Sequence, residues 1–325
     1  MTELFVGIEI GATKCQASLG TAEGELLHTR RLDVILEEGA EGILRWMRQN
    51  VAELISTGRD SGDCVRSIAV GFGGIIESAT GRILTSVQVK GWKDCMLRDW
   101  FQDELGLPTV ILNDTVAGSY GEYMRGSGKG TRVFFYSNIG SGIGGALVID
   151  GTCYDGLGYG AAYFGHTYIP DWMAVKPGAR RKVEDMCSGW AIERRLRSPG
   201  YVPVGSVLLE LCGGKRETLR CPMLGEAARQ GDAFALAEIE RTADSLATGL
   251  SNVITLFSPE CVAIGGGVAN MGDVLLDPVR RFVAERVFIS AKDRYRIVQS
   301  AFGDQVVLVG SMMYAAREGR ASRAG

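Results

Sequence analysis

A carboxylate lies at a strand-to-helix junction in VILNDTVAGSYGE, residues 110–122. An apolar run ends at Asn113 and Asp114, and a helical pattern follows to about Met124. A carboxylate at the end of a buried strand can accept a proton from a hydroxyl that attacks a phosphorus atom. The structural alternative is that Asp114 is an ordinary helix N-cap.

Three glycine clusters offer the backbone donors that bind phosphate groups. The first is EIGATKC, residues 9–15, in which Thr13 and Lys14 add a hydroxyl and a cation. The second is NIGSGIGGAL, residues 138–147, and the third is the strand end IGGG, residues 264–267, where a nucleotide base or ribose could lie. Alone, the first cluster also fits a β-hairpin turn and the second a flexible hairpin, and three glycines in a row are weak evidence for a binding site. Together with Asp114 they indicate phosphoryl transfer.

His166 lies in GYGAAYFGHTYI, residues 158–169, and is one of only two histidines in the chain. His166 could pack in the core, bind a metal or contact a substrate, and substrate contact is the favoured interpretation of its role. The basic cluster at 180–182 is interpreted as a solvated loop.

Composition and charge exclude two classes of binding partner, nucleic acids and membranes, from those expected. The 325 residues carry a net charge of −3, so nucleic acid is not an expected partner. No apolar run reaches 18 residues and no signal peptide is apparent, which predicts a soluble, cytoplasmic protein without membrane contact. The eight cysteines form no Cys-x-x-Cys pair, which is typical of reduced thiols.

The apolar patterns predict the elements that position these motifs. Residues 4–10, 15–20 and 26–34 are expected to form a β-meander, and residues 39–58 an amphipathic helix. A strand at 67–72, a helix at 95–106 and a strand at 109–114 follow. A second meander begins at 132, helices dominate 182–257, and a last helix starts near Val309. Because both halves open with a strand–glycine turn–strand unit, we expect a two-lobed α/β protein with a cleft between the lobes.

In this order the motifs resemble the ROK family of sugar kinases and repressors, over nearly the whole chain. The matching segments are IEIGATKCQASL, LNDTVAGSYGE, NIGSGIGGALVIDG, GHTYI, VEDMCSGWAIERR and FSPECVAIGGGV. The resemblance implies an actin-like ATPase, ribonuclease H-like fold. A small lobe would span residues 1–117 and a large lobe residues 118–308, with the helix at 309–325 packing back on the small lobe.

The resemblance also implies site roles. Asp114 would be the general base and Asn113 a sugar ligand, with His166 and Glu184 contacting sugar hydroxyls and Gly73 and Gly74 lining the sugar side. The nucleotide side, for ATP with Mg²⁺, would consist of Glu9, Gly11, Ala12, Thr13, Lys14, Gly140, Ser141, Gly142, Gly265, Gly266 and Gly267. A homodimer is expected from the family.

The chain departs from the family pattern at several positions. Many members bind a structural zinc through Gly-His and downstream cysteines, but no cysteine lies between His166 and Glu184, so no metal site is predicted here. Tyr163 replaces a glutamate, Gln88 an asparagine, and Glu9 an aspartate. Tyr163 and Gln88 lie on the acceptor side, where they imply an altered substrate.

We therefore expect an ATP-dependent kinase whose acceptor is a hexose, an amino sugar or a C7-cyclitol. Family repressors carry an N-terminal helix-turn-helix domain; because the phosphate hairpin begins at residue 9, we expect none here, which favours a kinase over a repressor. The alternative is a catalytically silent sugar-binding sensor on the same fold. Polyphosphate as donor would need a long basic groove, for which the cluster at 180–182 is too short.

Overall fold

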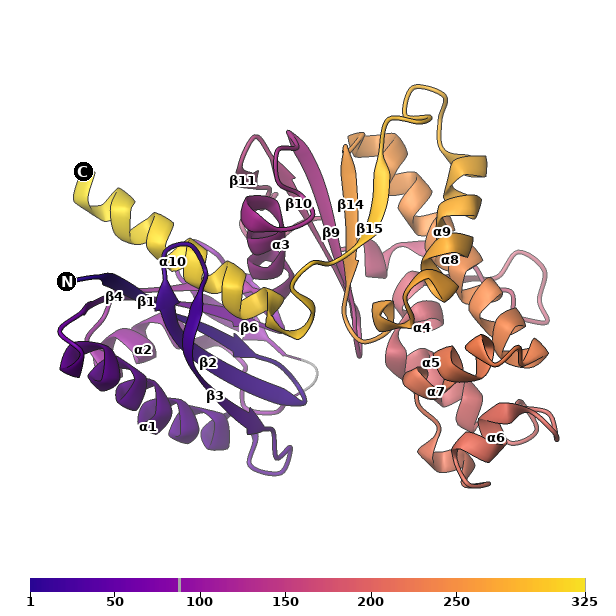
Figure 1. Ribbon diagram of the computed structural model, residues 1–325, viewed down its shortest axis with the longest axis horizontal. Coiled ribbons are helices and arrows are strands. Elements are labelled where there is room, and N and C mark those ends of the chain that lie inside the picture. Colours follow the sequence, from indigo (N-terminus) through magenta and orange to yellow (C-terminus); the bar gives the residue numbers. More distant parts are fainter. Residues whose placement is uncertain (87–88, 325) are drawn as a thin grey trace. The chain divides into compact units, whose positions relative to one another are not determined.

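Two compact units make up the chain, each assembled from separate stretches of sequence. Unit 1 contains Met1–Lys129, Ala146–Ala161 and Ala301–Gly325, and unit 2 contains Gly130–Gly145 and Ala162–Ser300. The computed structural model describes residues 1–86 and 89–324 (Figure 1). The predicted acceptor-side residue Gln88 lies outside the described residues.

The sheet of unit 1 has the strand order β3-β2-β1-β4-β8. Strands β1 (Glu3–Ile10), β2 (Lys14–Thr21) and β3 (Leu26–Asp33) are antiparallel neighbours, which confirms the predicted meander. Strands β4 (Cys64–Phe72) and β8 (Thr109–Asn113) run parallel to β1. The carboxyl ends of β1, β4 and β8 therefore share one edge of the sheet, which is where ligands bind in such folds.

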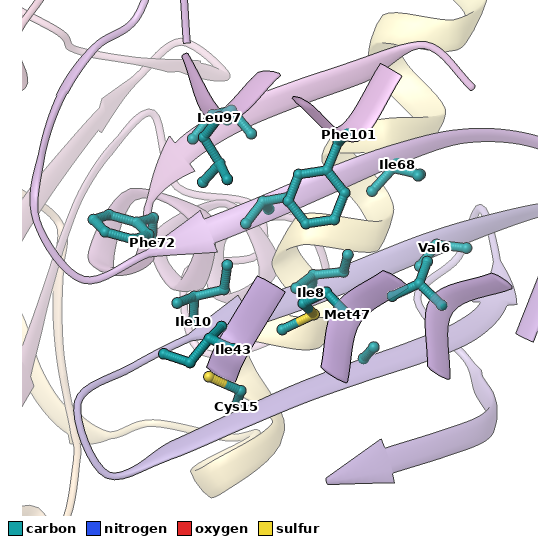
Figure 2. Packing of buried hydrophobic residues seen from close by; sticks show 14 of the residues in the cluster. Val6, Ile8, Ile10, Cys15, Ile43, Met47, Ile68, Phe72, Leu97 and Phe101 are labelled. Carbon is teal, nitrogen blue, oxygen red and sulfur yellow. The ribbon is translucent and has the colours of Figure 1, made fainter. Parts of the chain in front are cut away.

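Helices cover both faces of this sheet (Figure 1). Val6, Ile8 and Ile10 of β1 pack with α1 (Gly39–Asp60) and α2 (Leu97–Leu105) in the core drawn in Figure 2. The opposite face of β1 meets α10 (Val306–Ala324), where a Cβ on Gly7 would lie 2.6 Å from the Leu308 carbonyl oxygen. Successive residues of LFVGIEI thus pack on opposite faces of the sheet, as expected for a β-strand.

The remaining elements of unit 1 are short, apart from one helix. Strands β5 (Ile75–Glu77), β6 (Arg82–Thr85) and β7 (Cys95–Met96) form a small antiparallel sheet. Helix α3 (Asp114–Arg125) follows β8 directly and packs against α10. The 3₁₀ turn η4 (Gly303–Gln305) precedes α10 and brings Asp304 to the site described below.

Unit 2 contains three parallel strands in the order β9 (Val133–Ile139), β14 (Cys261–Gly265) and β15 (Arg296–Gln299). Its longest helix, α8 (Ala233–Phe257), packs against α9 (Asp273–Arg286) and α7 (Cys221–Arg229). The other elements are α4 (Val183–Cys187), α5 (Gly189–Arg197), α6 (Val207–Leu211), η1 (Phe164–His166), η2 (Arg216–Thr218) and η3 (Ala269–Met271). Strand β10 (Ile143–Ile149) leads from unit 2 into unit 1, where it pairs with β11 (Thr152–Cys153).

One sequence-based interpretation is wrong. Residues 180–182 are not a solvated loop: β13 (Arg180–Lys182) pairs antiparallel with β12 (Tyr168–Pro170). The ion pair between Arg181 and Asp171, at 2.7 Å, holds this hairpin, and the Asp171 side chain is only 3% exposed. The eight cysteines are all free thiols, as predicted. None of the helices within residues 1–86 and 89–324 has the length and hydrophobicity to cross a membrane.

Candidate active site

Helix α3 brings Asp114 to the edge of the unit 1 sheet. The N-cap of α3 is Asn113 rather than Asp114, because the Asn113 side-chain oxygen accepts from the backbone N–H groups of Thr115 (2.9 Å) and Val116 (3.3 Å). Asp114 is thereby left for another role. Its Oδ1 accepts from the Thr115 N–H at 2.7 Å, and its Oδ2 points towards Gly73.

The loop after β4 packs against this junction. The Gly73 N–H donates to the Ile10 carbonyl at 2.9 Å, and the Asn113 side-chain amide donates to the Gly74 carbonyl at 3.2 Å. Asn113 thus joins the loop to the helix start, and within residues 1–86 and 89–324 the second N–H of its amide has no hydrogen-bond partner. Gly73, Gly74, Asn113 and Asp114 are thereby brought together at this edge of the sheet.

A second polar cluster lies at the end of β1. The Gln16 amide donates to Glu9 Oε2 at 2.8 Å, and the Lys14 ammonium lies 3.5 Å from the same oxygen. Lys14 also donates to the Asp304 carbonyl at 3.2 Å. The side chains of Glu9 and Lys14 are 13% and 20% exposed, so this charge pair is only partly screened by solvent.

Burial raises the pKa of both carboxyl groups at this edge. Desolvation is the largest influence on the pKa of Asp114, and the hydrogen bonds from Thr115 offset it in part. Desolvation also raises the pKa of Glu9, and the charge of Asp114 raises it further, while Lys14 and Gln16 act in the opposite direction. The two carboxylates therefore interact electrostatically. Raised carboxylate pKa values of this kind are frequent in active sites.

One backbone N–H of the turn between β1 and β2 is hydrogen-bonded within the turn itself. The Gly11 N–H donates to the Lys14 carbonyl at 3.1 Å, which closes the hairpin. This hydrogen bond means that Gly11 shapes the turn instead of offering a free donor. Ala12, Thr13 and the Lys14 side chain are the remaining candidates for phosphate contact in this segment.

In unit 2 the other two glycine clusters lie side by side. Gly266 has φ +88°, and a Cβ there would lie 2.5 Å from the Ile139 carbonyl oxygen, so the strand end after β14 touches the loop after β9. The Val268 N–H donates to that same carbonyl at 3.0 Å. By contrast, no atom of the described residues lies within 4 Å of a Cβ placed on Gly140 or Gly267. These two positions border open space that a ligand could enter.

The glycine loop 140–143 is held from two directions by unit 2. The Ile143 N–H donates to Glu184 Oε2 at 2.7 Å, and the Gly189 N–H donates to the Gly140 carbonyl at 2.8 Å. On its other side the Ile143 carbonyl packs on Gly165, where a Cβ would approach to 2.3 Å. Gly165 and Glu184 are therefore part of the support for the phosphate loop.

His166 follows Gly165 in the turn η1. Phe164 is 2% exposed and anchors the turn under α8, while His166 itself is exposed. The Tyr163 and His166 rings meet edge to face with centroids 6.4 Å apart. The Lys182 ammonium, from β13, lies 3.2 Å from His166 Nδ1.

The predicted site residues thus form two clusters. Unit 1 holds Glu9, the turn at 11–14, Gly73, Gly74, Asn113 and Asp114, and unit 2 holds the glycine loops, Tyr163, His166 and Glu184. Sequence reasoning missed Gln16, the Asp304 carbonyl, Ile143 and Lys182. The position of Gln16 opposite Glu9 in a hairpin was a signal available in the sequence, whereas the other three contacts join residues far apart in the chain.

Comparison with known proteins gives a consistent picture. The model of the ROK family matches residues 5–318. The glucokinase of Thermotoga maritima is 30% identical over 94% of this chain and 95% of its own length. A ROK family glucokinase from Streptomyces griseus, solved in complex with glucose and AMPPNP, has a TM-score of 0.81 and 27% identity, covering 97% of this chain and 99% of that one. A putative xylose repressor of Caldicellulosiruptor sp. is 28% identical over 94% of this chain and 76% of its own length.

Proposed function

The chain belongs to the ROK family, and from this premise we propose that it is a carbohydrate kinase that transfers a phosphoryl group from ATP to a hydroxyl of a sugar or sugar-like polyol. Its α/β fold is the actin-like ATPase fold that the family resemblance implies. The relatives named as glucokinases support the phosphotransferase class, and the identity of the acceptor is a further part of the proposal.

The observation that carries the proposal is the environment of Asp114. Its carboxylate lies where β8 ends and α3 begins. Asn113, not Asp114, is the N-cap of α3, and burial raises the pKa of Asp114. In the proposed reaction the Asp114 carboxylate accepts the proton of the acceptor hydroxyl while that oxygen forms a bond to the terminal phosphorus. The bond from phosphorus to the bridging oxygen breaks, and ADP leaves. A raised pKa makes Asp114 a better proton acceptor than an ordinary aspartate.

Backbone donors are proposed to bind the nucleotide phosphates. Gly140 and Gly267 border open space, and Ser141 and Thr13 add hydroxyls. Lys14 supplies a positive charge that is already oriented by Glu9 and the Asp304 carbonyl. Because phosphoryl transfer depends mainly on positioning and on stabilising charge, these contacts are the larger part of the proposed catalysis.

The carboxylates at the sheet edge fit the Mg²⁺ ion that accompanies ATP. The charge of Asp114 disfavours ionisation of Glu9, so the two carboxylates interact electrostatically. Mg²⁺ is commonly bound through one or two carboxylates together with phosphate oxygens and water, which matches this donor set. When bound, the ion neutralises charge on the phosphates. Glu9, with its longer side chain, is proposed to reach it through water.

Tyr163, His166 and Glu184 of unit 2, and Asn113 of unit 1, are each proposed as ligands of the acceptor. The family has a glutamate at the position of Tyr163, and a carboxylate can accept hydrogen bonds from two sugar hydroxyls at once. Tyr163 instead offers a single hydroxyl and a ring face. The replacement of glutamate by tyrosine supports an acceptor other than glucose, such as another hexose, an amino sugar or a C7-cyclitol. A homodimer in the cytoplasm is proposed as the assembly, which sedimentation velocity would test.

An ADP-release assay over a panel of hexoses, amino sugars and cyclitols tests the kinase proposal. We expect at least one acceptor to raise ADP release well above the rate with ATP alone, and Asp114→Asn to abolish the increase. If no acceptor stimulates turnover, the kinase proposal fails.

The similarity to a putative xylose repressor supports a second candidate, a sugar-binding sensor without catalysis. Calorimetry with the same panel separates the two. A sensor would bind a sugar without turning over ATP, and Asp114→Asn would leave its function unchanged.

A further inference from the structure

His166 and Lys182 form a contact that no motif contains. The Lys182 ammonium lies 3.2 Å from His166 Nδ1, and the two residues belong to different elements of unit 2, β13 and η1. The Lys182 side chain is half-buried, and His166 is exposed. The distance is that of a hydrogen bond.

Only one arrangement of protons satisfies this contact. An ammonium group has three N–H donors and no acceptor, so Nδ1 must be the acceptor. A neutral imidazole carries a single N–H, which then lies on Nε2. The contact with Lys182 therefore selects the tautomer in which Nε2 is a hydrogen-bond donor.

The strand that carries Lys182 is held firmly. Lys182 pairs with Tyr168 in the β12–β13 ladder, and the Val183 N–H donates to the Thr167 carbonyl at 3.0 Å. The Arg181–Asp171 ion pair closes the hairpin at 2.7 Å. Lys182 thus projects from a strand whose register is specified by backbone pairing and a largely buried carboxylate.

His166 is equally well positioned from its own side. The packing of Gly165 on the Ile143 carbonyl and the burial of Phe164 place the turn η1, and Tyr163 meets the imidazole edge to face. With Nδ1 occupied by Lys182, Nε2 is the ring nitrogen available to a ligand.

We propose that Lys182 is a positioning residue that selects the Nε2–H tautomer of His166, so that His166 donates a hydrogen bond to an oxygen of the acceptor. The class of group recognised is an oxygen with a free lone pair, such as a hydroxyl or a carbonyl. The tautomer assignment follows from the contact alone, whereas its part in acceptor binding rests on the proposed function.

The two histidines of the chain allow a direct measurement. Two-bond ¹H–¹⁵N correlation spectra of the ¹⁵N-labelled protein distinguish imidazole tautomers, and His28→Gln identifies the signals of His166. In alkaline buffer we expect the Nε2–H pattern for His166. Lys182→Met should give a mixture of tautomers, while Lys182→Arg, which retains a donor-only cation, should keep the pattern.

The matched control is Arg180→Met on the same strand, because Arg180 is exposed and, among the described residues, its side chain donates only to the local carbonyls of Gly178 and Ala179. It should leave the spectrum unchanged. An Nδ1–H pattern in the unaltered protein, or an unchanged spectrum in Lys182→Met, overturns the tautomer assignment whether or not the protein is a kinase.

Kinetics test the acceptor role separately. Lys182→Met should raise KM for the acceptor roughly tenfold, the effect of losing a hydrogen bond of ordinary strength, with little change in kcat or in KM for ATP. An altered spectrum with an unchanged acceptor KM overturns the acceptor role. A protein that phosphorylates no acceptor contradicts the proposed function, and the spectra still decide the tautomer.

Discussion

The Glu184 carboxylate accepts a hydrogen bond from the backbone N–H of Ile143 at 2.7 Å. The resemblance to sugar kinases assigns Glu184 to the acceptor, yet this contact joins it to the glycine loop on the proposed phosphate side. A carboxylate has two oxygens and can accept several hydrogen bonds, so both roles are compatible. Glu184 is therefore a candidate for coupling acceptor binding to the position of the loop.

Replacement of Glu184 tests this coupling. Glu184→Ala should raise KM for both ATP and the acceptor, by about 10- to 100-fold, because a hydrogen bond to a charged group is lost at the loop. Glu184→Gln retains an oxygen that can accept from Ile143, so its effect on KM for ATP should be smaller. Steady-state kinetics with each substrate varied in turn measure both. Asp185→Asn, at the adjacent position, is the control, and an unchanged KM for ATP in Glu184→Ala would contradict the coupling.

Loss of the Asp114 carboxylate should affect chemistry far more than binding. Asp114→Asn should lower kcat by about 10²- to 10⁴-fold, since an amide cannot accept the proton of the acceptor hydroxyl. Calorimetry should find acceptor affinity within a few-fold of the unaltered protein. Asp103→Asn, on the exposed side of α2, controls for the general effect of a lost charge. Equal rates for Asp114→Asn and the unaltered protein would rule out the general-base role.

The same substitution should stabilise the fold, and the gain should depend on pH. Because the pKa of Asp114 is higher in the folded than in the unfolded chain, its contribution to stability is complete below the unfolded pKa of about 3.9 and is lost as the pH rises through the folded pKa. Asp114→Asn should therefore raise Tm at pH 7 and 8, with the difference shrinking towards pH 4. Thermal melts at several pH values check this, and a difference in Tm that is the same at every pH would contradict it.

The charge of Asp114 should influence the ionisation of Glu9. Since the Asp114 carboxylate raises the pKa of Glu9, Asp114→Asn should lower that pKa, which a carboxyl ¹³C titration measures. Glu9→Gln should raise KM for the Mg²⁺ complex of ATP, because one of the two proposed carboxylate contacts is removed. Glu3→Gln, on the same strand β1, is the matched control for this substitution. An unchanged pKa of Glu9 in Asp114→Asn would exclude the electrostatic coupling.

Two glycine substitutions should have opposite kinds of effect. Gly165→Ala should destabilise the protein by about 1–3 kcal/mol, because its Cβ would lie 2.3 Å from the Ile143 carbonyl oxygen. Gly140→Ala should leave Tm nearly unchanged, since its Cβ would meet nothing within 4 Å, but should raise KM for ATP if phosphate approaches that backbone. Denaturant melts and ATP titrations measure the two effects. A Gly165→Ala protein as stable as the unaltered one would contradict the close packing.

Much of the architecture is predictable from local sequence. The alternation of faces in residues 4–10, the turn residues of EIGATKC and the helical spacing of residues 39–58 each depend on neighbours only a few positions away. The position of Asp114 at a strand-to-helix junction was predicted in the same way. The choice between Asn113 and Asp114 as the N-cap was not, because both side chains cap helices well and the contact of Asn113 with the Gly74 carbonyl decides between them.

By itself, the sequence determined the order of the strands and helices, the residue types at the glycine loops and the absence of cysteines between His166 and Glu184. Only the tertiary structure decided which partners those residues meet: Ile143 for Glu184, Lys182 for His166, and the Asp304 carbonyl for Lys14. The physical reason is that periodicity and turn chemistry act over a few residues, whereas a hydrogen bond between distant residues exists only once sheets and helices have packed and set the distance.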